Sequence, residues 1–428
     1  MIDATQLAFT IAVATVVLLV YIFFKIIAKP QPDIQAKPEK EEEEEAIKQS
    51  TKTKEKKINL KSVPKNKETT FKHDWLSTCL KAHSDKITGI DFSSNGKYLL
   101  SCGNDRAVFL WSTKEFEMHQ HRNFRCNVEF DHAVKIRFSP DSKSFIAGLG
   151  NANTIKAFKI LKKEDSNIQI VSANMEDFPQ KHKTNLINIG ISCNSKYIMT
   201  CSKDTTFNVW NPKGDLLANI DTVLGNNNYA CISPCGRFIG VCGFTPDVKI
   251  WEVAFDKTDN FKEVRRAFEL KGHSAGIHCF AFNSDSSRMV SVSKDKTWRL
   301  WDTKIEYERG QDASLLLTVP LDQKGPSLIA ISPDSYSVAV TVNTTLLFFN
   351  GLTGQCDEVI DNVFNDSICE ISFSTDNNYL AVAGDRHVKI FRNITGHKTA
   401  IQDLKSQLKT VKTQSGKERI EQLIGQHR

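Results

Sequence analysis

The chain has 428 residues, and its hydrophobic fraction of 40% and charged fraction of 25% are those of a folded globular protein rather than a disordered one. The formal net charge is +6 at pH 7, but the excess lies in the two terminal segments, and residues 71–397 are neutral overall. A neutral central part lacks the broad basic surface of a nucleic-acid-binding protein.

An uncharged apolar stretch runs from Leu7 to Phe24 and consists mostly of Val, Ile, Leu and Phe. Together with the residues up to Ala28 it reaches about 20 residues, which is enough for a helix to span the hydrocarbon core of a bilayer. We predict a transmembrane signal-anchor over residues 1–28. The alternative is a cleaved signal peptide, but no Lys or Arg precedes the stretch and no small-residue cleavage pattern follows Phe24.

The charges on the two sides of this stretch predict its orientation. The N-terminal flank has no Lys or Arg, whereas residues 25–40 contain four lysines. Because positive flanks stay in the cytosol, we expect the rest of the chain on the cytosolic side. Cysteine usage agrees, because the eleven cysteines are odd in number and several, such as Cys102 and Cys201, lie in apolar strand patterns typical of reduced core residues.

Residues 29–70 are predicted to be a disordered charged linker. They contain the acidic block Glu41–Glu45 and the lysine-rich run 52–57, and they have no aromatic residue with which to build a core. A flexible chain of this length has an average reach of roughly 35 Å, so the segment would act as a tether. The lysine run could instead bind anionic lipid or nucleic acid, and this alternative stays open.

Seven similar units of about 41 to 53 residues follow, which predicts an all-β, seven-bladed β-propeller over residues 71–397. Each unit has an apolar segment, a short polar turn and a second strand-like part that ends in Trp or Phe. The turns are residues 92–96, 138–142, 191–195, 232–236, 282–286, 331–335 and 373–377. The aromatic ends are Trp111, Phe158, Trp210, Trp251, Trp301, Phe349 and Phe391.

In three units a His, a Ser or Thr, an Asp and a Trp recur with spacings of 18, 4 and 6 residues. The three sets are His83, Ser101, Asp105 and Trp111; His182, Thr200, Asp204 and Trp210; and His273, Ser291, Asp295 and Trp301. The same residue types form Ser/His/Asp catalytic triads, but a catalytic site occurs once per domain, whereas these sets occur three times, each beside a Trp. We therefore predict a structural role for them and no catalytic residue.

These sets resemble the hydrogen-bonded tetrads of the WD-repeat family. The resemblance implies that the Asp binds the His, that the His binds the Ser or Thr, and that this hydroxyl accepts a hydrogen bond from the Trp indole. The other four units are degenerate: the second retains His132 and Asn153, the fourth Asp247, and the sixth and seventh Asn343 and Asp385.

A propeller must close its ring, because an open edge strand is a template for aggregation. The last unit stops after its third strand, at Phe391, and a strand-like segment precedes the first His. We predict that residues 73–81 supply the missing outer strand of the seventh blade.

Residues 398–428 are predicted to form a short amphipathic C-terminal helix and a tail. The apolar residues Ile401, Leu404, Leu408 and Val411 fall on one helical face. We expect this face to pack on the side of the ring, with binding to a partner or to a membrane surface as the alternative.

Two long excursions between strands are candidate partner-binding loops: the insertion between Phe255 and Leu270, and the polar stretch from Lys162 to Lys183. No metal or cofactor site is predicted. Cys231 and Cys235 lack a second pair of ligands at matching spacing, and the chain has no glycine-rich phosphate loop.

The order of anchor, linker, divergent WD units and helical tail resembles a membrane-anchored member of the WD-repeat family from the endoplasmic reticulum. This resemblance implies a non-enzymatic scaffold on the cytosolic face of that membrane. It implies protein partners from the unfolded-protein response, including the stress kinase that phosphorylates initiation factor 2, and contact with mRNA or the translation machinery as a further partner. No small-molecule substrate is expected.

The alternative function is that of a guanine-nucleotide exchange factor for a small GTPase at the endoplasmic reticulum. A membrane-tethered propeller is also found in the exchange factor that starts vesicle coats there. In that protein the anchor follows the ring, whereas here the predicted anchor precedes it.

Overall fold

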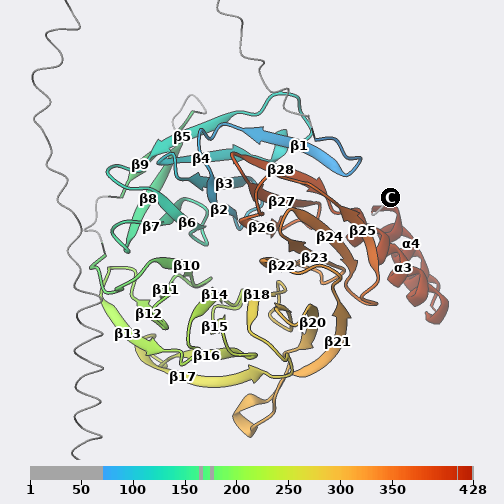
Figure 1. The fold of residues 1–428 in the computed structure, drawn as a ribbon. Helices are drawn as coiled ribbons and strands as arrows, with labels where there is room; N and C mark the ends of the chain where they lie inside the picture. The colour runs from blue at the N-terminus through green and yellow to red at the C-terminus, as the bar shows by residue number, and fades with distance from the viewer. Residues whose placement is uncertain (1–70, 163–166, 174–177, 412, 427–428) are drawn as a thin grey trace, which may run out of the picture. The chain divides into compact units, whose positions relative to one another are not determined.

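The computed structural model describes residues 71–162, 167–173, 178–411 and 413–426. Its strands form seven four-stranded antiparallel sheets arranged as blades around a centre, which confirms the predicted seven-bladed β-propeller (Figure 1). The predicted anchor and linker, residues 1–70, lie outside the described residues. Within the described ranges, no helix is long and apolar enough to cross a membrane.

In each blade the first strand lies nearest the centre and the fourth lies at the periphery. Blade 1 contains β2 (Ile87–Phe92), β3 (Tyr98–Gly103), β4 (Ala107–Ser112) and β5 (Asn123–Asn127). Blade 2 contains β6 (Ala133–Phe138), β7 (Ser144–Leu149), β8 (Ile155–Lys162) and β9 (Ile168–Ser172). Blade 3 contains β10 (Leu186–Ile191), β11 (Ile198–Ser202), β12 (Thr206–Trp210) and β13 (Leu216–Asp221).

The remaining blades follow the same order. Blade 4 contains β14 (Asn227–Ile232), β15 (Phe238–Gly243), β16 (Val248–Phe255) and β17 (Phe261–Leu270). Blade 5 contains β18 (Ile277–Phe282), β19 (Arg288–Ser293), β20 (Thr297–Asp302) and β21 (Ser314–Pro320). Blade 6 contains β22 (Ser327–Ile331), β23 (Ser337–Val342), β24 (Thr345–Asn350) and β25 (Cys356–Ile360). Blade 7 contains β26 (Glu370–Phe373), β27 (Tyr379–Gly384), β28 (His387–Arg392) and β1 (Leu76–Lys81).

The seven polar turns connect the first two strands of each blade and share one geometry. In the first of them the Ser93 hydroxyl accepts a hydrogen bond from the Tyr98 backbone N–H, at 2.9 Å. The fifth residue of every turn, from Gly96 in the first to Asn377 in the last, has a positive φ between 57° and 71°. Gly and Asn tolerate this left-handed conformation, and Ser286 and Ser335 at the same position accept hydrogen bonds from the turn of the preceding blade.

The ring closes as predicted. β1 pairs antiparallel with β28, with Thr78 opposite Ile390 and Lys81 opposite His387. The first strand of the described chain therefore completes the last blade, and the two ends of the propeller are held together by a full ladder of backbone hydrogen bonds.

The hydrophobic core lies between neighbouring blades. Leu100 and Val108 of blade 1 pack with Ile136 and Ala147 of blade 2, and all four are fully buried. The same arrangement recurs around the ring. Each blade therefore buries both of its faces against its neighbours, as expected for repeats that cannot fold alone.

Two helices, rather than the single predicted one, follow the ring. α3 (Ile394–Thr410) begins at Asn393, whose side chain accepts a hydrogen bond from the Gly396 N–H, and it ends where Val411 adopts an extended conformation. α4 (Gln414–Gln426) then lies beside α3 at the edge of the ring (Figure 1). The extended Val411 ends the first helix, and no proline or glycine lies beside it to predict this break.

The contact between α3 and the ring lies nearer its N-terminus than expected. Thr395, Gly396, Thr399 and Ala400 are buried, and α3 contacts β23 and β24 of blade 6. The predicted apolar stripe from Ile401 to Val411 is only half-buried, because the rest of α3 extends past the blade and pairs with α4.

Each of the two predicted loop excursions contains an outer strand. β17 pairs with β16 from Phe261 to Leu270, which leaves residues 256–260 as the turn. β9 likewise pairs with β8 in the described part of the stretch from Lys162 to Lys183. An outer strand forms hydrogen bonds with the backbone N–H and C=O groups of the neighbouring strand. The stability gained in this way favours a strand, although the polar composition of both segments suggested loops.

Candidate functional site

The tetrads of blades 1 and 5 form continuous hydrogen-bond chains. In blade 5, His273 Nδ1 lies 2.9 Å from the Asp295 carboxylate and His273 Nε2 lies 2.8 Å from the Ser291 hydroxyl. The Trp301 indole donates to that hydroxyl at 2.9 Å. Blade 1 has the same contacts, with His83 3.0 Å from Asp105 and 2.9 Å from Ser101.

The hydrogen-bond inventory explains why four residue types are needed. The indole N–H can only donate, so the serine hydroxyl accepts from it and donates in turn to His Nε2. The imidazole then carries its proton on Nδ1 and donates it to the Asp carboxylate. Every donor in this chain has an acceptor, which is the condition for burying polar groups without loss of stability.

The contacts within each tetrad are those of a Ser/His/Asp triad, and burial decides its role. Ser101 and Ser291 are fully buried, and each accepts an indole N–H at the place where a substrate carbonyl would have to approach. A nucleophile must be reachable by its substrate. The tetrads therefore act as internal clasps of their blades.

The tetrad of blade 3 is looser, although its sequence spacing is identical. His182 Nε2 binds the Thr200 hydroxyl at 2.7 Å, but Nδ1 lies 3.9 Å from Asp204. The Thr206 hydroxyl donates to Asp204 at 2.5 Å, and the Asn208 amide lies 3.2 Å from His182 Nε2. In blade 5 the equivalent Thr297 makes the same hydrogen bond to Asp295, so the contact that distinguishes blade 3 is that of the Asn208 amide with His182, and the link from His182 to Asp204 is not closed directly.

The electrostatics of the closed tetrads follow from their burial. Burial lowers the pKa of His273, although the hydrogen bond to Asp295 opposes the change, so the imidazole is neutral at pH 7. Burial alone would raise the pKa of Asp295, but hydrogen bonds from the Thr297 hydroxyl, the Ser274 N–H and His273 outweigh it and hold the pKa at about 2. Asp295 is therefore ionised.

Two degenerate blades join their loops through an aspartate in another way. In blade 7, Asp385 at the tetrad position accepts hydrogen bonds from the backbone N–H groups of Asn365 and Asp366, at 3.0 Å each. In blade 2 the tetrad aspartate is missing, but Asp131, next to the retained His132, accepts from the backbone N–H of Asn151 at 3.0 Å. Each of these aspartates still joins two loops, although neither blade has a complete tetrad.

A second polar cluster lies on the inner strands and was not predicted. Glu370 on β26 is 6% exposed and accepts hydrogen bonds from Lys135 Nζ at 3.0 Å and from Arg137 Nη2 at 2.9 Å, both on β6. Its carboxylate also accepts the backbone N–H of Ile90, which lies on β2 between those two strands. Arg137 reaches on to the Asn188 side chain on β10, at 3.2 Å.

This central cluster links the inner strands of blades 7, 1, 2 and 3. The pKa of Glu370 is lowered, because the attraction of Lys135 and Arg137 outweighs the cost of burial. Charged groups that are paired inside a protein bind one another rather than a ligand, so the cluster acts as an inner brace. Its members come from units 2 and 7, which are far apart in sequence.

The basic residues of the β16–β17 hairpin are also neutralised internally. Glu252 accepts hydrogen bonds from Arg237 Nε and Arg265 Nε, at 2.6 Å each. Arg237 donates to the Tyr307 hydroxyl at 2.5 Å, which fixes the excursion containing η2 (Tyr307–Arg309) against blade 4. Arg266 pairs with Glu269. Arg265 and Arg266 are therefore paired with carboxylates, whereas Lys262 lies exposed on β17.

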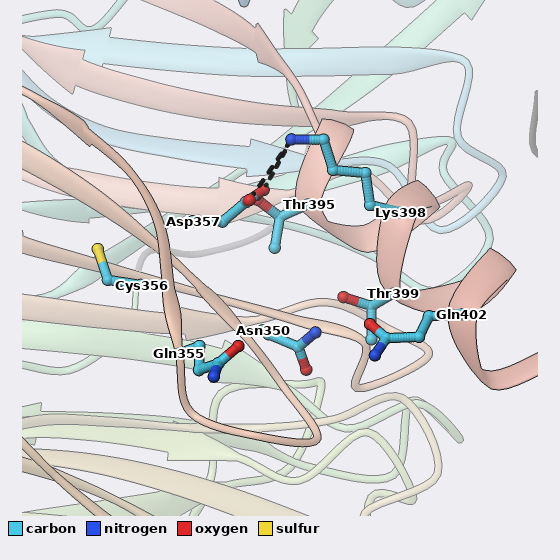
Figure 2. A pocket seen from close by; sticks show the side chains of 8 residues that line it. All are labelled: Asn350, Gln355, Cys356, Asp357, Thr395, Lys398, Thr399 and Gln402. Atoms are coloured by element: carbon cyan, nitrogen blue, oxygen red, sulfur yellow. Dashed lines mark hydrogen bonds and ion pairs between the residues drawn. The ribbon is translucent and has the colours of Figure 1, made fainter.

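A polar pocket of about 180 Å³ lies where α3 meets blade 6. It is lined by Asn350, Gln355, Cys356, Asp357, Thr395, Lys398, Thr399 and Gln402 (Figure 2). Asp357 accepts a hydrogen bond from Thr395 at 2.8 Å and pairs with Lys398 at 3.3 Å. The charges of this pocket satisfy each other, so it serves as the joint between helix and ring. In the described ranges, His, Cys, Asp and Glu side chains form no group of three that could hold a metal ion.

Comparisons with known proteins agree with this architecture. The family described as WD domain, G-beta repeat matches residues 75–112, 178–211, 264–302 and 360–392, which correspond to blades 1, 3, 5 and 7. Transducin beta-like protein 2 of Mus musculus is 48% identical over 358 residues, which are 83% of this chain and 81% of that protein. The Homo sapiens protein of the same name is 46% identical over 83% of this chain and 80% of its own length. Apoptotic protease-activating factor 1 of Danio rerio is 23% identical over 59% of this chain and 19% of its own.

Proposed function

Because the chain belongs to the family of transducin beta-like protein 2, we propose that it is a membrane-anchored scaffold that binds signalling proteins on the cytosolic face of the endoplasmic reticulum. The observation that carries the proposal is the identity of 46–48% over 83% of the chain. WD-repeat propellers bind proteins and are generally non-catalytic.

The described structure supports the scaffold role in two ways. The ring is closed by β1 and braced by the central cluster, so it is a rigid platform with loops on both faces. Its three Ser/Thr–His–Asp sets are buried clasps, and their hydroxyls are committed to Trp indoles. Both features fit a protein that presents surfaces rather than one that transforms a substrate.

The membrane part of the proposal rests on the sequence. The uncharged stretch Leu7–Phe24 supports an anchor, and the lysines that follow it support a cytosolic position of the ring. We propose the endoplasmic reticulum as the membrane. The proposed partners are signalling proteins of the unfolded-protein response, above all the stress kinase of initiation factor 2, with RNA of the translation machinery as a further partner.

Proximity labelling in cells tests the scaffold role. The full-length chain fused to a labelling enzyme is compared with the same fusion lacking residues 1–28, with and without endoplasmic-reticulum stress. We expect the full-length fusion to label the stress kinase and cytosolic translation proteins more strongly under stress, and the truncated fusion to lose this labelling. Equal labelling by both fusions would contradict a membrane-tethered scaffold.

Glycosylation reports the orientation independently. Asn343, Asn365 and Asn393 each begin an N-glycosylation acceptor sequence. Asn393 is fully buried at the start of α3, whereas Asn365 is exposed on a loop of blade 7, so Asn365 is the informative site. We expect no change in gel mobility after endoglycosidase treatment of the full-length protein from cells. A shift that disappears in Asn365→Gln would place the ring in the lumen.

A further inference from the structure

One end of blade 4 presents two large apolar side chains to solvent. Phe244 and Val223 are each 70% exposed. Phe244 follows β15, and Val223 lies between β13 and β14. The pairing of Asn227 with Gly243 and of Val248 with Leu270 places both residues at the same end of the blade.

The backbone that carries Phe244 is held by three closely packed loops. The Phe244 N–H donates to the Asn226 carbonyl at 3.1 Å. A Cβ at Gly243 would lie 1.9 Å from that carbonyl oxygen, and one at Gly276 would lie 2.6 Å from the Phe244 carbonyl oxygen. Side chains are therefore excluded at both positions, and yet the aromatic ring held by this packing points into solvent.

Val223 is a β-branched residue with a φ of +51°, a conformation that costs free energy for such a side chain. Lys249 Nζ stabilises the turn by donating to the carbonyls of Thr222 and Val223, at 3.0 Å each, and the Val223 N–H donates to Asp221 at 2.9 Å. An exposed valine gains little from burial here. The backbone strain at Val223 is not offset by packing of its side chain, which indicates that this residue serves binding rather than folding.

The surroundings of this pair are basic. At the same end of blades 3 to 5 lie seven lysines, namely Lys181, Lys183, Lys203, Lys249, Lys271, Lys294 and Lys296. The carboxylates there are Asp204, Asp221, Asp247, Glu269, Asp295 and Asp322, and Lys271 also pairs with Asp312. Against these seven carboxylates stand the seven lysines, Lys324, Arg266 and Arg299, which leaves an excess of positive charge at this end.

We propose that Phe244 and Val223 form a docking site for a protein segment that carries a bulky apolar side chain flanked by Asp or Glu. Rigidly presented aromatic residues are the usual anchors of protein interfaces, and the basic rim selects acidic neighbours. The aliphatic Val223 offers no flat face for a nucleobase, so the pair fits a peptide side chain better than RNA. This inference deepens the proposed scaffold role by stating the chemistry of its partner.

A matched control exists on the same ring. Phe130, between β5 and β6, is 92% exposed and has a φ of +62°, so its exposure and backbone resemble those of the proposed site. Its neighbours are Glu129 and Asp131 in place of lysines. Phe130→Ser therefore removes an exposed aromatic residue without touching a basic rim.

The test is a selection of short random peptides displayed on phage against the purified full-length protein in detergent. We expect the selected peptides to share an aromatic or branched aliphatic residue flanked by acids. Their affinity, measured by fluorescence polarisation, should fall about tenfold or more in Phe244→Ser and remain unchanged in Phe130→Ser. Val223→Gly separates binding from folding, because it relieves the positive φ and should weaken binding without lowering the melting temperature.

Three results would overturn the proposal: failure to select any peptide, selection of neutral or basic peptides, or full binding to Phe244→Ser. Binding of homopolymeric RNA that is lost in Phe244→Ser would reassign the site to nucleic acid. The selection needs neither a membrane nor cellular stress. If the peptide selection fails while the full-length fusion still labels its partners in cells, the docking site is ruled out but the scaffold role is not.

Discussion

The tetrads and the central cluster bury polar groups in the same ring by different means. A tetrad joins residues of one unit, such as His273, Ser291 and Asp295, over 22 residues of sequence. The central cluster joins Glu370 to Lys135 across 235 residues, and it occurs once. The comparison teaches that contacts within one unit recur in the sequence at a fixed spacing, as the tetrads do in three units, whereas contacts between units leave no periodic pattern.

The strongest test of this comparison breaks the central cluster. Glu370→Ala leaves Lys135 and Arg137 buried without their shared carboxylate, and we expect the free energy of unfolding to fall by about 3–5 kcal/mol. Urea unfolding of the purified protein measures the change. Glu358→Ala, which removes a half-exposed carboxylate on β25, is the matched control and should change stability by less than about 0.5 kcal/mol. Equal effects in the two variants would contradict the role of an inner brace.

The second test separates the closed tetrad from the loose one. Asp295→Ala or His273→Ala leaves buried partners unsatisfied, and each should reduce the free energy of unfolding by about 1–3 kcal/mol. Asp204→Ala should have a smaller effect, because Asp204 lies 3.9 Å from His182 and binds Thr206 instead. Melting temperatures of the three variants decide the matter. A loss at Asp204 as large as that at Asp295 would show that the two blades are equivalent in spite of their geometry.

Acid should weaken the two regions in different pH windows. Burial lowers the pKa of His273 in the folded protein below its ordinary value of 6.5. As the pH falls below about 6.5, this histidine is therefore protonated in the unfolded chain before it is protonated in the fold, and the free energy of unfolding decreases. Glu370 has a pKa below its ordinary value of 4.5, so its contribution is present above about pH 4.5 and is lost as the pH falls further.

Unfolding free energies measured from pH 7.5 to pH 3.5 check this order of events. We expect His273→Asn to flatten the slope between about pH 6.5 and pH 4.5, and Glu370→Gln to flatten it below that range. If His273→Asn flattened the slope below about pH 4.5 and Glu370→Gln flattened it above that pH, the assignment of these pH ranges to the two regions would be refuted.

The smallest expected effect concerns Asp91, beside the central cluster. Burial raises its pKa to about 6, although Arg137 opposes the change, so the charged form is disfavoured in the fold at neutral pH. Since the folded pKa lies above the unfolded value of 3.8, its contribution is most favourable below pH 3.8 and declines as the pH rises towards 6. Asp91→Asn should therefore stabilise the protein at pH 7 by on the order of 1 kcal/mol and have no effect near pH 3.5. A loss of stability at pH 7 would mean that attraction to Arg137 dominates.

The features that were predictable from the sequence are those that recur. The turn pattern, the aromatic strand ends and the 18-4-6 spacing predicted seven blades and located the twelve tetrad residues, and the missing fourth strand of the last unit predicted the closure by β1. Each of these signals is local or is imposed by the need to close the ring.

The features that were missed depend on contacts between units. Nothing in the 18-4-6 spacing shows that His182 and Asp204 would lie 3.9 Å apart, or that the Asn208 amide would contact His182. The polar composition of residues 261–270 concealed an outer strand, because the exposed edge of a blade tolerates charged side chains. The pairing of Glu370 with unit 2 requires the ring geometry itself.

The closure of blade 7 also fixes when this protein can finish folding. β1 is synthesised first, but its partner β28 ends at Arg392, roughly 300 residues later, which at about 5–20 residues per second is a delay of roughly 15–60 s. During that time the backbone groups of β1 that will pair with β28 have no partner strand, while the strands of the first six blades are synthesised. A chain that stops before β28 never covers this edge, so a premature stop codon anywhere before His387 yields an incomplete ring that is exposed to chaperones and proteases.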